Sequence, residues 1–437
     1  MKTLLNLLPI WLIALGMNTS HAAKTPNIIL ILVDNLGRDS IACYGGKYAT
    51  PNIDQLAKDG VRYETVWSMP ACTPSRVTLL TGQYPFRHGW TQHYNVARLG
   101  GEGLNGKRFK TVAKCLREGG YQTAIGGNWL INHLSTQPGA LQDHGFQEHC
   151  VWVDAKPEQT GKGTRNLTPQ LLINGKLEKV VNGEKRINAF LTEFAARDRK
   201  QPFFIYYPML LDGVPPTESK RTSTQQSSEN MSLRATSIKH VDQLIGDLIK
   251  AVDTNALQDK TIILLTGNYV SAIANDTTKQ NDEPKNTRIS DQGVRAPLIV
   301  RAPKQIKGGR VSRDLIDFTD FYPTFMELAG IKTPDSLILD GRSFVPSLCG
   351  SEDPYQKRSW IYSQLGSTRM IRDWEHLIDT NRNFHDLLED PLQQDEVNPL
   401  DKIAPGRRQR LQIILDRFPN NAASPFPAYS RVIQSID

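Results

Sequence analysis

The sequence lacks the patterns that define several classes of protein. Its five cysteines form neither a CxxC pair nor a zinc-like spacing, and no internal repeat is visible. Beyond the N-terminus no apolar stretch is long enough to span a bilayer. Lys and Arg exceed Asp and Glu by only 52 − 45 = 7 over 437 residues, a balance that favours anionic partners in general. We therefore expect a globular protein that binds neither nucleic acid nor, once processed, a membrane.

The N-terminus has the features of a secretory signal peptide. Lys2 precedes a short apolar run from Leu4 to Met17, and small residues at Ser20 and Ala22 suit a cleavage site. We predict a signal peptide over residues 1–23 and export of the mature chain to a periplasm or the medium.

Continuous apolar runs alternate with helical patterns through most of the chain. This alternation predicts an α/β fold with a mostly parallel central sheet covered by helices on both faces. A change to short strands and turns after Gly341 predicts a smaller C-terminal α+β domain, so we divide the chain into 24–345 and 346–437. Polar stretches near 208–232 and 270–292 are expected to be irregular lids or disordered segments. The expected strands are 27–33, 122–125, 203–207, 261–265 and 297–300, and the expected helices are 53–60, 112–119, 186–197, 238–251 and 407–418.

The sharpest local motif is Cys72-Thr-Pro-Ser-Arg76. Pro74 suits the first turn of a helix, which predicts that Cys72 lies at a helix N-terminus, where N–H groups favour negative charge. Arg76, one turn later, adds a forked cation suited to a tetrahedral oxyanion. A purely structural interpretation stays open, in which Pro74 starts the helix and Arg76 is a buried ion-pair partner.

This motif, followed by Gly82, resembles the sulfatase signature. The resemblance continues at Pro26–Gly37, at Gly120–Trp129 and at Pro202–Met209. Later segments that match are Gly293–Val300, Asp317–Thr324, Asp340–Ser343 and Phe384–Pro391. The resemblance covers nearly the whole mature chain and implies an alkaline-phosphatase-like fold.

The resemblance also implies a reaction. In sulfatases the motif cysteine, here Cys72, is converted by a maturation enzyme to formylglycine, whose hydrate attacks the sulfur of a sulfate ester. A calcium ion held by oxygen ligands binds the sulfate and activates the nucleophile. Carried over residue by residue, the metal ligands are Asp34, Asn35, Cys72 and Asn268, and Cys72 and Arg76 are catalytic. The implied substrate is a sulfated small molecule or glycan.

Several family residues are replaced in this chain. Asn35 stands where a second Asp is usual, and the later metal Asp is missing at Gly267 or Asn268, depending on a one-residue shift. Asn128 and Leu130 replace a Lys and a polar residue. The other replacements are Gly213 for a His and Asn286 for a second Lys, with Lys285 as the nearest candidate to bind the sulfate.

Three functions are compatible with this pattern. The first is sulfate-ester hydrolysis through a formylglycine at Cys72, with activity impaired or lost because calcium affinity depends on the number of carboxylates. The second is a non-catalytic exported protein that binds sulfated carbohydrate. The third is a phosphoesterase of the same superfamily, which would also need a metal site.

Overall fold

The computed structural model describes residues 25–96, 101–153, 170–211, 223–268, 289–302, 306–393, 397 and 405–419, with the backbone alone for 223–232 and 405. The expected signal peptide lies outside these residues, as do Gly213, Lys285, Asn286 and positions 270–288 of the expected irregular stretch 270–292. In the described part of the chain, no helix is both long and apolar enough to cross a membrane.

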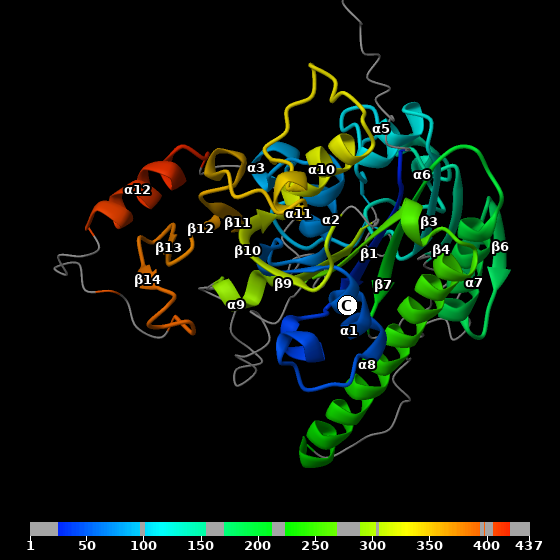
Figure 1. Ribbon diagram of the computed structural model, residues 1–437, viewed down its shortest axis with the longest axis horizontal. Helices are drawn as coiled ribbons and strands as arrows, with labels where there is room; N and C mark the ends of the chain where they lie inside the picture. The colour runs from blue at the N-terminus through cyan, green and yellow to red at the C-terminus, as the bar shows by residue number, and fades with distance from the viewer. Residues whose placement is uncertain are drawn as a thin grey trace, which may run out of the picture.

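A ten-stranded mixed sheet forms the centre of the molecule (Figure 1). Its middle strands are parallel: β1 pairs with β7 and β8, and β3 pairs with β7 and β4. Antiparallel strands extend the sheet on both sides, and β10 returns to a parallel pairing with β2. The order is β10 (Arg310–Asp317), β2 (Val61–Trp67), β9 (Arg295–Arg301), β8 (Thr261–Asn268), β1 (Asn27–Asp34), β7 (Phe203–Leu210), β3 (Gln122–Gly127), β4 (Glu148–Val153), β5 (Gln170–Ile173) and β6 (Lys176–Lys179).

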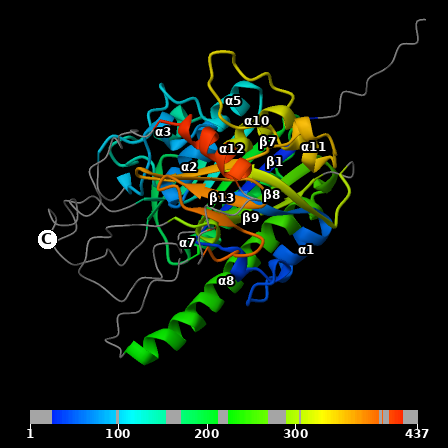
Figure 2. The ribbon, with the colours of Figure 1, turned by 90° about the vertical axis from the view of Figure 1, so that its left-hand side faces the viewer.

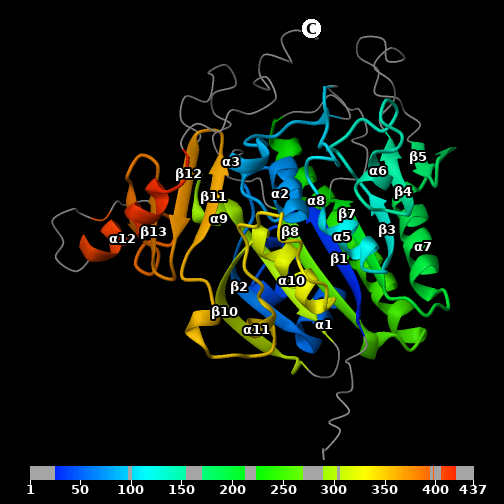
Figure 3. The ribbon, with the colours of Figure 1, turned by 90° about the horizontal axis from the view of Figure 1, so that it is seen from above.

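Helices cover both faces of this sheet, as the sequence predicts. All eight residues of β1 are buried, because its alternate side chains enter two separate apolar clusters. One cluster includes Ile28, Leu30 and Leu32 and is covered by α2 (Cys72–Thr81), α5 (Val112–Glu118) and α10 (Phe321–Leu328). The other includes Ile29, Ile31 and Val33 and is covered by α1 (Pro51–Asp59), α7 (Gly183–Ala196) and α8 (Ser223–Thr254). Figure 1 shows α1 and α8 below the strands and α2, α5 and α10 above them, and Figure 3 looks down on the layer that contains α2 and α10.

A four-stranded antiparallel sheet lies beside the main sheet and carries α12 (Pro405–Asp416) against it (Figures 1 and 2). Its strands are β11 (Ile361–Leu365), β12 (Thr368–Arg372), β13 (His376–Asp379) and β14 (Phe384–Asp386). This sheet and its helix confirm the smaller C-terminal α+β unit. The boundary between 345 and 346 stays a prediction. Short helices α3 (Pro85–His88), α6 (Ala140–Asp143), α9 (Asp291–Val294) and α11 (Val345–Leu348) complete the set of described α-helices.

One expectation about irregular structure is wrong. The polar stretch expected to be irregular up to residue 232 is helical from Ser223, because α8 begins there and runs to Thr254. The sequence from Ser223 to Ile245 contains neither Gly nor Pro, so nothing in it breaks a helix. One end of α8 extends beyond the body of the molecule (Figures 1 and 2).

Candidate active site

The residues of the candidate site meet at the carboxyl edge of the central sheet. Asp34 is the last residue of β1 and lies in register with Asn268, the last residue of the parallel strand β8. Asn128 directly follows β3, and Cys72 begins α2. Open α/β sheets commonly form their ligand sites at this edge, because the loops that leave parallel strands gather there.

Cys72 occupies the helix terminus that the sequence predicts. Helix α2 begins at Cys72, with Pro74 in its first turn and Ala71 in extended conformation before it. The Ser75 hydroxyl donates to the Ala71 carbonyl at 2.7 Å, which ties the first turn to the preceding chain. Cys72 is half-buried, whereas the eight residues that follow it are all buried. The Cys72 side chain is therefore the accessible group of this helix start.

Arg76 is an almost completely buried ion-pair partner of Asp34. Its side chain is 1% exposed, and its Nη2 lies 2.5 Å from the Asp34 Oδ2. Its Nη1 donates to the backbone carbonyl of Asn128. The guanidinium thus joins the ends of β1 and β3, in agreement with the structural interpretation in which Arg76 is a buried ion-pair partner. Its Nε has no hydrogen-bond partner among the described residues.

Asn268 donates a hydrogen bond to the other carboxylate oxygen of Asp34. The Asn268 Nδ2 donates to the Asp34 Oδ1 at 2.8 Å, and the backbone N–H of Asn35 donates to the Asn268 carbonyl at 2.8 Å. Gly267 is excluded as the metal-site position, because a Cβ there would lie 2.1 Å from the Leu36 carbonyl oxygen. Of the two positions open in the sequence, Asn268 is therefore the one that faces Asp34.

A histidine that sequence reasoning missed lies beside Cys72. The His93 Nδ1 is 3.1 Å from the Cys72 Sγ and 3.5 Å from the Thr73 Oγ1. Burial, with a further contribution from Asp34, raises the pKa of the Cys72 thiol to about 12, although Arg76 opposes this shift. Burial also lowers the pKa of His93 from its ordinary value, with Asp34 opposing. At neutral pH the pair thus consists of a neutral thiol and a neutral imidazole within hydrogen-bonding distance.

No motif in the sequence could have indicated His93. The separation of Cys72 and His93 in the sequence is not a spacing typical of metal ligands or of a nucleophile and its base. The turn after α3 brings His93 back to the start of α2. The backbone N–H of Tyr94 donates to the Thr73 Oγ1 at 3.0 Å and fixes that turn against the helix. Proximity of this kind comes from the tertiary structure alone.

The second replaced segment contributes backbone groups to the site. The carbonyl of Asn128 accepts from Arg76, and its N–H donates to the Pro208 carbonyl at 2.8 Å. Leu130 has a left-handed backbone conformation, with φ of 63°, which costs free energy for a side chain other than Gly, Asn or Asp. Lys285, the remaining sequence-predicted site residue, lies outside the described residues.

The described residues do not fit a calcium ion. Calcium needs six to eight oxygen ligands with several carboxylates. Asp34 is the only carboxylate that the described segments bring to this edge beside Cys72, and both of its oxygens accept hydrogen bonds. No three His, Cys, Asp or Glu side chains of the described residues are arranged to hold a metal. The Arg76 Nε, which is buried and unpaired at this site, is a donor and cannot bind a cation.

Comparisons with known proteins agree with the sequence motifs. The sulfatase family model matches residues 26–331, and the model of the N-sulphoglucosamine sulphohydrolase C-terminal region matches residues 286–389. N-acetylgalactosamine-6-sulfatase of Canis lupus familiaris is 26% identical over 369 residues, which cover 78% of this chain and 69% of that protein. The ulvan-active sulfatase of Formosa agariphila is 27% identical over 388 residues, covering 86% and 69%.

Solved structures share the fold. The crystal structure of Ps i-CgsB matches with a TM-score of 0.74 at 24% identity, covering 94% of this chain and 96% of that one. The structure of another protein, in complex with its substrate D-glucosamine-2-N,6-O-disulfate, matches with a TM-score of 0.66 at 20% identity. The match covers 90% of this chain and 97% of that one.

Proposed function

The chain belongs to the sulfatase family, and on this basis we propose that it is an exported protein that binds sulfate esters of carbohydrates at the Cys72 site, with ester hydrolysis impaired or lost. Its partners are then a sulfated glycan or small molecule and, where Cys72 is converted, a maturation enzyme. Lys285 is the candidate residue for an additional contact to the sulfate.

The observation that carries this proposal is the hydrogen bonding of Asp34. Arg76 and Asn268 occupy its two oxygens, so the one carboxylate of the described site is already neutralised and bonded. A bound cation is often the largest local charge in a site and stabilises the negative charge that develops in the transition state. Loss of a single preorganised donor costs about 100- to 1000-fold in rate. Hydrolysis should therefore be far more impaired than binding.

Two features support a sulfate ester as the ligand. Cys72 is the accessible residue at the N-terminus of a ten-residue helix, whose free N–H groups favour an anion. The similar proteins named above include an N-acetylgalactosamine-6-sulfatase and an ulvan-active sulfatase. A sulfated sugar is the ligand class that both features have in common.

A working sulfatase is the second candidate, and His93 favours it. The motif Cys72–Arg76 is complete, and the His93 Nδ1 lies 3.1 Å from the Cys72 Sγ. If Cys72 is converted to formylglycine, this nitrogen is placed to accept a proton from the hydrate. No specific observation favours the phosphoesterase alternative.

Mass spectrometry of the purified exported protein tests the proposal, together with its calcium content and binding of sulfated monosaccharides. We expect binding of N-acetylgalactosamine 6-sulfate or a related sugar sulfate, no bound calcium, and hydrolysis no faster than that of the Cys72→Ala variant. Formylglycine at Cys72 with bound calcium and turnover above that variant would replace the proposal by a working sulfatase. Absence of binding to any sugar sulfate would refute both.

A further inference from the structure

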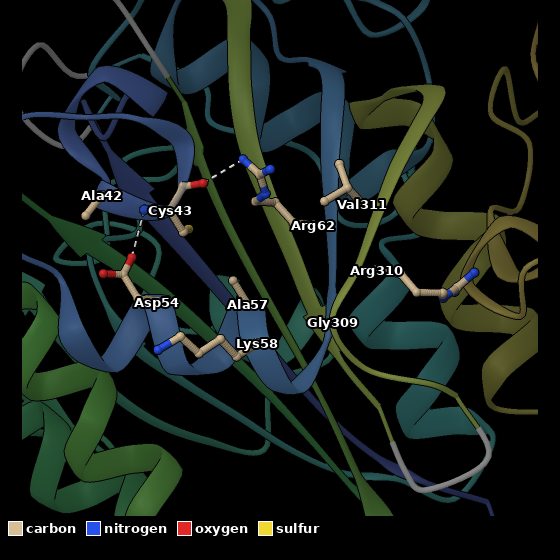
Figure 4. A pocket seen from close by; sticks show the side chains of 9 residues that line it. All are labelled: Ala42, Cys43, Asp54, Ala57, Lys58, Arg62, Gly309, Arg310 and Val311. Carbon is tan, nitrogen blue, oxygen red and sulfur yellow. Dashed lines mark hydrogen bonds between the residues drawn. The ribbon is translucent and has the colours of Figure 1, made fainter.

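A second pocket opens at the carboxyl ends of β3 and β7, between α7 and α8. This pocket has a volume of about 410 Å³. Another pocket, beside α1 and drawn in Figure 4, has a volume of about 390 Å³. Both volumes are in the usual range for ligand pockets. The pocket between α7 and α8 is lined by Gly127, Trp152, Glu184, Tyr207, Lys239 and His240, among others.

The pocket in Figure 4 is a poor candidate for a ligand site, because its charged groups are already engaged. Arg62 donates to the Cys43 carbonyl and pairs with Glu64. Asp54 accepts from the backbone N–H of Cys43, as the dashed line in Figure 4 shows. Arg310 donates to the Leu348 carbonyl and points away from the cavity. Lys58 alone remains as an exposed cation there.

The pocket between α7 and α8 borders the Cys72 site through the end of β3. Gly127, in its lining, directly precedes Asn128, whose carbonyl accepts from Arg76. A side chain at Gly127 is not possible, since a Cβ would lie 2.0 Å from the Pro208 carbonyl oxygen. Trp152 lines both this pocket and a small cleft that includes Asn128. The pocket therefore borders the strand end that contacts Arg76, and it shares Trp152 with the cleft that includes Asn128.

The lining groups suit a sugar better than a simple anion or an apolar molecule. The indole of Trp152 is half-buried and offers an apolar surface, while Glu184 offers an acceptor for hydroxyl groups. Lys239 is exposed and His240 half-buried, and both are potential donors to a sulfate group. A bare anion would meet the carboxylate of Glu184, and an apolar molecule would leave these polar groups unpaired.

Tyr207 adds a donor that the protein itself does not use. Its side chain is 2% exposed, and no hydrogen bond within the described part of the chain engages its hydroxyl. Burial raises the pKa of Tyr207 well above its ordinary value, with a further contribution from Glu184, so the hydroxyl stays protonated. The Tyr207 hydroxyl is not among the fully buried, unpaired polar atoms of the described residues, so it has access to the pocket and can donate to a ligand hydroxyl there.

We propose that the pocket between α7 and α8 binds a sugar unit adjacent to the sulfated unit of an oligosaccharide held at the Cys72 site. This inference rests on the proposed function and deepens it, because it identifies the ligand as a sulfated oligosaccharide. Trp152 packs against the sugar ring, Tyr207 and Glu184 bond its hydroxyls, and Lys239 with His240 contacts a further sulfate.

Isothermal titration calorimetry with matched ligands tests this inference. The probes are N-acetylgalactosamine 6-sulfate with a chondroitin 6-sulfate tetrasaccharide, and an ulvan tetrasaccharide with the sulfated monosaccharide it contains. For at least one pair we expect the tetrasaccharide to bind about tenfold more tightly than the monosaccharide, as one good contact cluster would give. Lys239→Ala and Trp152→Ala should each remove most of this difference and leave the affinity for the monosaccharide unchanged. Lys58→Ala, at the exposed lysine of the other pocket, is the matched control and should change neither affinity.

The outcomes separate the inference from the proposed function. Equal affinities for the tetrasaccharide and the monosaccharide in both pairs would overturn the inference and leave the proposed function intact. The same holds if Lys239→Ala and Trp152→Ala both keep the full difference. Lys239 is exposed, so its variant will fold even if Trp152→Ala, which removes an indole packed on Gly183, does not. Absence of binding to every probe would overturn both.

Discussion

The Arg76 guanidinium and the Asp34 carboxylate form a buried ion pair, with the Arg76 Nη2 2.5 Å from the Asp34 Oδ2. Their side chains are 1% and 4% exposed. The pair lies close enough to Cys72 to affect the pKa of its thiol, and it joins the ends of two central strands through the Asn128 carbonyl. The Arg76 guanidinium and the Asn268 amide thus donate hydrogen bonds to the two oxygens of the carboxylate at the candidate metal site.

Removal of the Arg76 charge should strongly destabilise the fold. Arg76→Met leaves Asp34 buried without its counterion, and we expect the free energy of unfolding to fall by about 3–5 kcal/mol. Urea unfolding monitored by tryptophan fluorescence measures this change. Arg197→Met is the control, because Arg197 and Glu148 form an ion pair that is 47% and 24% exposed, worth about 1 kcal/mol or less. Similar losses in the two variants would contradict the structural role of Arg76.

Calcium should not stabilise the wild-type protein. With one carboxylate at the site, already bonded to Arg76 and Asn268, millimolar calcium should leave the midpoint of thermal unfolding unchanged in differential scanning fluorimetry. The double variant Asn35→Asp with Asn268→Asp places two more carboxylates beside Asp34. It should be less stable than wild type without calcium and gain stability when calcium is added. A calcium-dependent shift in wild type would show that other residues complete a metal site.

In protein whose Cys72 is unconverted, the thiol should react slowly with iodoacetamide. Its pKa is raised to about 12, chiefly by burial, and only the thiolate reacts. At pH 7.5 we expect alkylation of Cys72 to be at least about 100-fold slower than that of the exposed Cys349 in the same molecule. The rate at Cys72 should keep rising up to pH 11. Peptide mass spectrometry follows both sites, and equal rates at pH 7.5 would show that Cys72 is an activated thiolate.

Stability should decrease as the pH falls below about 6.5, the ordinary pKa of histidine in the unfolded chain. Burial lowers the pKa of His88 to about 3. Burial also lowers the pKa of His144 to about 4, although a hydrogen bond to the Leu104 carbonyl opposes this shift. The unfolded state then binds protons that the folded state does not. Each histidine therefore removes up to about 1.4 kcal/mol per pH unit between pH 6.5 and 4.

The variant His88→Gln tests this slope. Gln can replace the ring contacts of His88 with the Thr78 hydroxyl and the Trp90 N–H, both at 3.1 Å, without titrating. Urea unfolding at several pH values should show a shallower decrease between pH 6.5 and 4 than in wild type. The control is His240→Gln on α8, whose histidine is only half-buried. If His88→Gln and wild type lose stability equally over this range, the buried neutral histidine is not the cause.

Much of the fold could be predicted from the sequence, because it depends on local patterns. The run Asn27–Val33 is apolar at every position, which is possible only for a strand covered on both faces, and β1 is such a strand. Pro74 fixed the start of α2 at Cys72 for a similar local reason. The irregular expectation for 223–232 failed because polar composition does not by itself prevent a helix when Gly and Pro are absent.

The sequence alone thus determined the alternation of buried strands with helices and the identity of the Cys72 motif. Hydrophobic periodicity, apolar runs and proline positions are properties of neighbouring residues. Only the tertiary structure decided what those residues contact. It selected Asn268 over Gly267 through the register of β8 with β1, and it brought His93 to Cys72. It also assigned Arg76 to Asp34, because a buried carboxylate takes whichever donors the packing of separate strands places within hydrogen-bonding distance.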